Sequence, residues 1–164
     1  MCEDEITTWI RGRIPESWFN GPPEVDCDGD EILVVGPLGG PISRSGSAGD
    51  SVDGQIQRFR QATRDQRMRI AQDAERRFGR KVSWGAAVGG ERRLFTTLSV
   101  PVMTRLRLPE RQLLDTLVGA GVARSRSDAL AWCVRLVAKH EADWISELRE
   151  ALVRVGELRR KGPV

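Results

Sequence analysis

The strongest constraint in this sequence is a short segment whose side chains alternate with period two. Of residues 103 to 108, one side carries Thr104, Leu106 and Leu108, and the other side carries Met103, Arg105 and Arg107. This alternation predicts a β-strand. A lone strand leaves its N–H and C=O groups without partners and its apolar side uncovered. The segment therefore predicts a second strand, and a second copy of the chain is its simplest source.

Two helices are predicted after this segment. Pro109 fits a first helical turn, and Gly119 and Gly121 end the helix. Between them, apolar residues recur at helical spacing, at Leu113, Leu114, Leu117 and Val118. Ser127 is the predicted N-cap of the second helix. Its apolar pattern continues beyond Lys139, so the helix is expected to run on for about 20 residues, as a coiled dimer seam or a lid on the preceding domain.

The order of strand, proline, helix, glycine turn, Ser-Arg-Ser and helix in residues 102–139 resembles the ribbon-helix-helix (Arc/MetJ/CopG-like) family of DNA-binding proteins. The resemblance rests on a pattern of residue types rather than on an invariant string. It implies a homodimer in which two strands form an antiparallel ribbon over four helices. Such a ribbon fits the major groove of double-stranded DNA. Family members usually carry this module at a chain terminus, whereas residues 1–101 precede it here.

The resemblance assigns roles to six residues. The positions that would contact bases are Met103, Arg105 and Arg107, and a guanidinium can bond bidentately to a guanine edge. The positions that would contact phosphate are Ser125, Arg126 and Ser127, at the start of a helix, where free N–H groups and the dipole favour an anion. The expected function is a sequence-specific transcriptional regulator that acts as a homodimer.

The part of the chain before this module is predicted to contain a ββαββ arrangement, a small antiparallel sheet covered by one helix. Its predicted strands cover residues 24–27, 31–35, 81–88 and 93–98, and one long helix is predicted from residue 55 to residue 80. The turns Asp28-Gly29-Asp30 and Gly89-Gly90 join the strands in pairs. Trp84 is expected in the core beneath the helix.

The fold class is therefore predicted to be α+β, with two domains. Residues 1–98 form the small N-terminal domain, and residues 99–164 form the ribbon-helix-helix module with its extended C-terminal helix. A glycine- and serine-rich stretch, residues 36–54, is expected to be a flexible loop. It lacks the glycine spacing of a dinucleotide fingerprint and a Gly-Lys-Ser/Thr, and its prolines remove N–H donors, so nucleotide binding is not favoured.

Charge is distributed unevenly along the chain. Residues 1–53 carry 3 basic and 11 acidic side chains, residues 54–81 carry 9 and 3, and residues 102–139 carry 7 and 3. This asymmetry predicts a polyanion-binding body with an acidic N-terminal region that could meet a protein partner. On the predicted helix, Arg58, Arg69, Arg76 and Arg80 share one stripe. The stripe is either a solvated surface or an auxiliary set of DNA phosphate contacts.

The residue inventory argues against catalysis. The chain has one histidine, no tyrosine, and no HExxH, GxSxG or paired Cys-x-x-Cys motif. Cys133 and His140 would lie about 10 Å apart on one helix, too far for one metal ion. No enzyme activity, cofactor or metal is therefore expected.

Location and membrane contact are also predicted from composition. Three widely spaced cysteines argue against a disulfide framework and agree with a reducing compartment. We find no apolar run of membrane length and no basic-then-apolar leader at Met1. A cytoplasmic protein without a membrane partner is expected.

Two alternative functions are compatible with the same residues. In a protein-interaction dimer, antitoxin-like or scaffold in type, the ribbon would serve only as a dimer seam, and the acidic N-terminal region or the last helix would bind another protein. In a nucleoid-associated DNA-binding protein, the arginine stripe would dominate. That protein would show a steep salt dependence and little preference between specific and random DNA.

Overall fold

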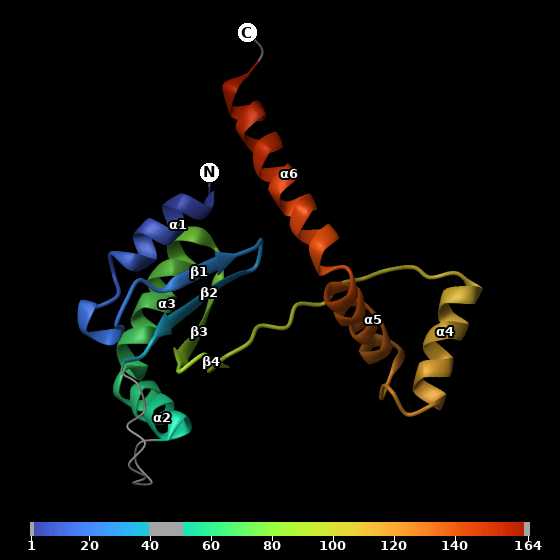
Figure 1. Ribbon diagram of the computed structural model, residues 1–164, viewed down its shortest axis with the longest axis horizontal. Helices are drawn as coiled ribbons and strands as arrows, with labels where there is room; N and C mark the ends of the chain where they lie inside the picture. Colours follow the sequence, from blue (N-terminus) through green and yellow to red (C-terminus); the bar gives the residue numbers. More distant parts are fainter. Residues whose placement is uncertain (1, 40–50, 163–164) are drawn as a thin grey trace. The chain divides into compact units, whose positions relative to one another are not determined.

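The computed structural model describes residues 2–39 and 51–162, which belong to two compact units, Met1–Pro101 and Val102–Val164 (Figure 1). The predicted boundary lay between residues 98 and 99. The elements of the first unit are α1 (Cys2–Arg11), the 3-10 helix η1 (Glu16–Trp18), β1 (Glu24–Cys27), β2 (Glu31–Pro37), α2 (Val52–Ala62), α3 (Arg64–Phe78), β3 (Lys81–Val88) and β4 (Glu91–Leu94). Those of the second unit are α4 (Leu108–Gly119), α5 (Arg126–His140) and α6 (Ala142–Lys161). The predicted α+β class is confirmed.

The sheet of the first unit has the strand order β1-β2-β3-β4, and its central pair is parallel. The outer pairs, β1 with β2 and β3 with β4, are antiparallel hairpins. The prediction of a wholly antiparallel sheet is therefore wrong at the pair of β2 and β3. A parallel pair needs a long crossover connection, and the helices α2 and α3 supply it.

The two predicted hairpin turns are confirmed. In the first, Asp28 Oδ1 accepts hydrogen bonds from the N–H groups of Asp30 (2.9 Å) and Glu31 (2.8 Å). These bonds favour the carboxylate and lower the pKa of Asp28. In the second, Gly89 and Gly90 have φ angles of 58° and 88°, a left-handed backbone that suits a tight hairpin turn. The last strand, β4, ends earlier than predicted, at Leu94.

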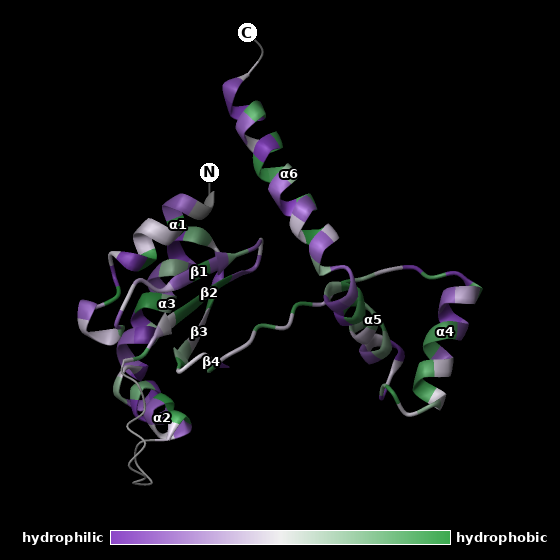
Figure 2. Ribbon diagram, in the orientation of Figure 1, coloured by the Kyte–Doolittle hydropathy of each residue, from purple (hydrophilic) through white to green (hydrophobic). Residues whose placement is uncertain are grey.

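The main core of the first unit lies between β2, β3 and the two helices α1 and α3. Its buried residues are Ile6 and Ile10 of α1, Ile32 and Val34 of β2, Ile70 and Ala74 of α3, and Trp84 of β3. Figure 2 shows the apolar colour concentrated on the central strands and on the sides of the helices that face them. Trp84 is only 3 % exposed, which confirms its predicted core position. Ile6 and Ile10 are four residues apart, as are Ile70 and Ala74, so each pair lies on one face of its helix.

The predicted single helix over residues 55–80 is wrong, because the chain breaks at Thr63. The backbone of Thr63 has φ −100° and ψ 0°, and α2 ends there before α3 begins. The Arg67 guanidinium donates to Thr63 Oγ1 (2.9 Å) and to the carbonyl oxygen of Arg60 (2.8 Å). A continuous helix would pair that carbonyl with the N–H of Arg64. The side chain of Arg67 therefore satisfies the end of α2 and stabilises the break.

The loop between β2 and α2 is shorter than predicted. β2 runs to Pro37, and α2 begins at Val52, with Ser51 Oγ accepting from the N–H of Gly54 (3.1 Å) as the N-cap. Of the loop predicted over residues 36–54, residues 40–50 lie outside the described residues.

The helices of the second unit follow the predicted pattern except at the start of α5 and at Glu141. Pro109 lies in the first turn of α4, and α4 ends at Gly119, as predicted. The long second helix is divided at Glu141, which has φ −114° and ψ 31° and separates α5 from α6. No helix within residues 2–39 or 51–162 combines the length and apolar character needed to cross a lipid bilayer.

Gly36 offers a test of packing in the first unit. A Cβ at residue 36 would clash with the buried ring of Phe19, whereas a Cβ at Gly29 would meet nothing within 4 Å. We expect Gly36→Ala to lower the free energy of unfolding by about 1–3 kcal/mol through overpacking. Gly29→Ala, the matched control, should change it by less than about 0.5 kcal/mol. Urea denaturation of the full chain measures both, and equal effects would contradict the packing described.

Candidate nucleic-acid interface

The segment that carries the predicted base contacts lies exposed before α4. Residues 101–107 form no helix or strand in the single chain, so the predicted strand is not present there. A strand needs a neighbour to pair its N–H and C=O groups, and no described residue provides one. Met103 is 98 % exposed, and Arg105 and Arg107 are also exposed. The guanidinium groups of both arginines make no hydrogen bond or ion pair with the described residues.

One residue of the segment is anchored to the second unit. Leu106 is half-buried and packs against the cluster of Leu114, Ala123 and Ala129. Its carbonyl oxygen accepts a hydrogen bond from Arg111 Nη1 (2.7 Å). Arg105 and Arg107, on either side of this anchored residue, are both exposed, and the backbone of Arg107 is extended (φ −81°, ψ 176°).

The predicted phosphate contacts lie at the start of α5, where the N-cap is Ser125 rather than the predicted Ser127. Ser125 Oγ accepts from the N–H of Asp128 (3.2 Å), and Asp128 Oδ2 accepts from the N–H of Arg124 (3.0 Å). The first bond is that of a capping box. In the second, the side chain three positions after the cap accepts from the residue before the cap and not from the cap itself. Ser127 lies inside the first turn. Its N–H and that of Arg126 precede the first intrahelical bond, so they face outward from the helix end.

The guanidinium of Arg126 is occupied by an ion pair with α4. Its Nε and Nη2 donate to Asp115 Oδ1 and Oδ2, each at 2.6 Å, in a bidentate arrangement. The hydrogen bond from Arg126 lowers the pKa of Asp115, and the same bond raises the pKa of Arg126. A phosphate at this helix end would therefore compete with Asp115 for the arginine, while the backbone N–H groups of residues 126 and 127 stay accessible.

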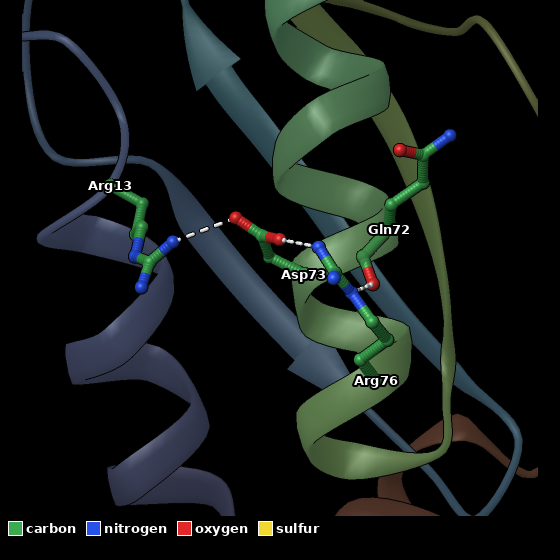
Figure 3. Close-up of polar contacts among 4 residues, drawn as sticks. All are labelled: Arg13, Gln72, Asp73 and Arg76. Carbon is green, nitrogen blue, oxygen red and sulfur yellow. Dashed lines mark hydrogen bonds and ion pairs between the residues drawn. The ribbon is translucent and has the colours of Figure 1, made fainter.

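The four arginines of the predicted stripe differ in their surroundings. Arg76 pairs with Asp73, which also accepts from Arg13 Nη1 (2.8 Å), and Arg76 Nε donates weakly to the carbonyl oxygen of Gln72 (Figure 3). Arg80 follows α3 and is half-buried. Arg58 and Arg69 are exposed and make no ion pair with the described residues. Because α2 and α3 are separate helices, the four residues do not lie on one helix face.

A basic cavity that sequence reasoning missed lies beside the break at Thr63. Its volume is about 400 Å³, and its lining residues are Gln57, Arg60, Gln61, Arg64, Arg67, Met68, Phe95 and Thr96. Arg67 is 7 % exposed, and its guanidinium lies 5.0 Å from the centre of the Phe95 ring. Burial and the neighbouring positive charges of residues 60 and 64 lower the pKa of Arg67. The recurrence of arginine at helical spacing was the signal in the sequence.

The described residues offer no group of side chains suited to hold a metal. In residues 2–39 and 51–162, no three His, Cys, Asp or Glu side chains gather closely enough to hold a metal ion. Cys133 packs at the edge of the second unit's core, and His140 is exposed at the end of α5.

Two family models match the chain, and their ranges fall within the two compact units. A model described as "Rv1265-like protein, N-terminal domain" matches residues 4–94, and one described as "Mb1296 C-terminal domain" matches residues 107–159. The chain is 56 % identical over 155 residues to the proteins Mb1296 of Mycobacterium bovis and Rv1265 of Mycobacterium tuberculosis. Each match covers 94 % of this chain and 69 % of the relative. No solved structure matches the chain. Neither family description names an activity.

Replacing the two serines at the start of α5 tests the position of the cap. Ser125→Ala should lower the free energy of unfolding of the second unit by about 1 kcal/mol, because the N–H of Asp128 loses its partner. Ser127→Ala is the matched control and should have an effect near zero. Thermal unfolding followed by circular dichroism compares the two. A larger loss of stability for Ser127→Ala than for Ser125→Ala would show that Ser127 is the N-cap.

The bidentate ion pair predicts a pH dependence. The pKa of Asp115 is lowered in the folded chain, so the pair stabilises the fold above the ordinary carboxyl pKa, and this stabilisation is lost as pH falls through the lowered value. NMR titration should find the pKa of Asp115 below its usual range, and Arg126→Gln should return it towards that range. Arg124→Gln serves as the control and should leave it unchanged. A normal pKa in the parent chain would refute the pair.

Proposed function

The chain belongs to the Rv1265-like family, and we propose that it is a homodimeric, sequence-specific DNA-binding regulator of transcription. In this proposal, residues 103–107 of two copies pair as an antiparallel ribbon. The ribbon enters the major groove of double-stranded DNA and presents Met103, Arg105 and Arg107 to the bases. The arrangement corresponds to the ribbon-helix-helix resemblance of residues 102–139.

The observation that carries the proposal is the state of the segment itself. Residues 105 and 107 hold two guanidinium groups that are exposed and have no carboxylate or carbonyl partner among the described residues. Several other arginines of the chain, such as Arg76 and Arg126, are occupied by acidic neighbours. Two unneutralised guanidinium groups two residues apart can both bond to base edges or to phosphates, because each presents paired N–H donors.

The small core of the second unit supports the dimer. Its buried apolar residues among those described are Leu114, Ala123 and Ala129. Three buried side chains are too few to offset the conformational entropy of a unit with three helices. Leu108 and Leu113 are both more than half exposed beside the segment. A second copy would cover these side chains and supply the missing strand partner together.

The ends of the helices and the remaining arginines add contacts without sequence information. The N–H groups of Arg126 and Ser127, with the positive end of the α5 dipole, suit a DNA phosphate that flanks the groove. Arg58 and Arg69 of the first unit are unneutralised and suit further phosphates. The proposal treats these as auxiliary contacts, because phosphate contacts raise affinity for all sequences alike.

An arginine exchange separates base reading from phosphate attraction. We expect Arg105→Ala/Arg107→Ala to lose about 1–3 kcal/mol of discrimination per arginine between a selected genomic site and random DNA. The comparison variant, Arg58→Ala/Arg69→Ala, removes the same charge from the first unit. It should weaken binding to all sequences equally and reduce the salt slope by about 1 per arginine.

The measurement is DNA binding by fluorescence anisotropy over a salt series, with binding sites enriched from genomic fragments. Equal discrimination by the Arg105/Arg107 variant and the parent would refute the ribbon. If specific and random DNA bind alike and the Arg58/Arg69 variant loses most affinity, the nucleoid-associated alternative replaces the regulator. If the parent chain has no measurable affinity for DNA at low salt, both DNA-binding functions are refuted and the protein-interaction dimer is the remaining alternative.

A further inference from the structure

The last helix, α6, carries an apolar seam in which Ile145 is half-buried and the other three residues are exposed. Its 20 residues span about 30 Å, and none of them is buried. Ile145, Leu148, Leu152 and Val155 follow one another at intervals of three, four and three residues. This is the spacing of a coiled-coil seam. Leu152 is 68 % exposed, and Figure 2 shows apolar and polar patches side by side along α6.

The seam has a charged residue at each end. Glu141 lies one helical turn before Ile145, since its carbonyl oxygen accepts from the N–H of that residue (3.0 Å). Arg159 lies four residues after Val155 and continues the same spacing. Neither charged side chain makes an ion pair with the described residues. The seam therefore reads as an acidic end, four apolar residues and a basic end.

We propose that α6 pairs with α6 of a second copy of this chain in antiparallel orientation. With Leu148 placed opposite Leu152 of the second copy, Ile145 lies opposite Val155. The same register places Glu141 opposite Arg159, and it does so twice, once at each end. Every layer of the pair is then either apolar against apolar or acidic against basic.

A parallel pair fails the same test of register. It would stack Arg159 on Arg159 and Glu141 on Glu141 at the two ends of the seam, and like charges facing each other destabilise a pair of helices. The rest of α6 is also acidic in its first half and basic in its second half. Residues 142–150 carry three acidic and one basic side chain, and residues 151–161 carry four basic and one acidic. An antiparallel pair places these unlike halves together.

The helix dipole is a second explanation for the acidic start and the basic end of α6. Acidic residues near an N-terminus and basic residues near a C-terminus also complement the dipole of an isolated helix. That effect is independent of which face a residue occupies. The position of Arg159 on the apolar face, four residues after Val155, is explained by a partner helix and not by the dipole. Glu141, the N-cap residue of α6, fits both explanations.

This contact is independent of the proposed ribbon, since it uses no residue of the segment before α4. The two self-contacts would together hold copies at two places, either within one dimer or between dimers on neighbouring DNA sites. The Arg105→Ala/Arg107→Ala variant should keep the α6 contact even where DNA binding is lost, so that the two proposals can fail separately.

A charge-swap cycle in the full chain tests the pairing. Arg159→Glu and Glu141→Arg should each weaken self-association by about tenfold or more in sedimentation equilibrium at low salt, because each sets two like charges in opposition. The double variant Glu141→Arg/Arg159→Glu should restore the parent's association. The matched controls are Arg160→Glu and Glu157→Arg, which make the same charge changes away from the seam and should leave association unchanged.

The outcomes of this cycle are distinct. Unchanged association of the single variants, no rescue by the double variant, or equal losses in the controls would each overturn the proposal. Weakened self-association in both single variants, together with restored self-association in the double variant, supports the proposal. A chain that sediments as a monomer at all concentrations also overturns it.

Cysteine cross-linking checks the orientation independently of affinity. Under mild oxidation, Leu148→Cys/Leu152→Cys should form a disulfide between residue 148 of one copy and residue 152 of the other, identified by mass spectrometry of tryptic peptides. The single variant Leu148→Cys should not link to its own counterpart. A disulfide joining residue 148 to residue 148 would establish a parallel pair and overturn the proposal.

Discussion

The apolar surface that the second unit cannot bury by itself is the constraint on which its structure depends. Leu114, Ala123 and Ala129 make a small core between α4 and α5, while most of the segment before α4 is exposed and no residue of α6 is buried. Burial of apolar surface is the main favourable term in folding. In our proposal, contacts with another copy bury more of this surface, and the two proposed contacts divide it between them.

The first unit buries its core through contacts within a single chain. Its sheet packs β2 and β3 against α1 and α3, and the break at Thr63 is held by a buried arginine that bonds the end of one helix and stacks on Phe95. Such a buried charge is tolerated where its donors are bonded and its plane rests on an aromatic ring. The first unit can thus fold on contacts that lie within a single chain.

Ion pairs reduce the positive charge that the chain presents to a polyanion. Arg13 and Arg76 share Asp73, and Arg126 is bonded bidentately to Asp115. The 26 basic residues of the sequence therefore overstate how many side chains are available to a polyanion. Arg105 and Arg107, like Arg58 and Arg69, are exposed and make no ion pair with the described residues.

Local patterns in the sequence determined much of the secondary structure. Both hairpin turns and the bounds of α4 could be predicted, since each depends on residues a few positions apart. The exposure of Arg105 also follows from the alternation around Leu106. These features rest on spacing, capping and backbone preference alone.

Tertiary structure decided the features that depend on distant partners. The parallel pairing of β2 with β3 follows from the path of the helical crossover, and Arg126 turns towards Asp115 because α4 packs beside α5. The break at Thr63 required a side chain four residues away to bond a carbonyl seven residues back. Periodicity counts residues along one face and cannot report such bonds, because they form only when the side chain meets its acceptor in the folded chain.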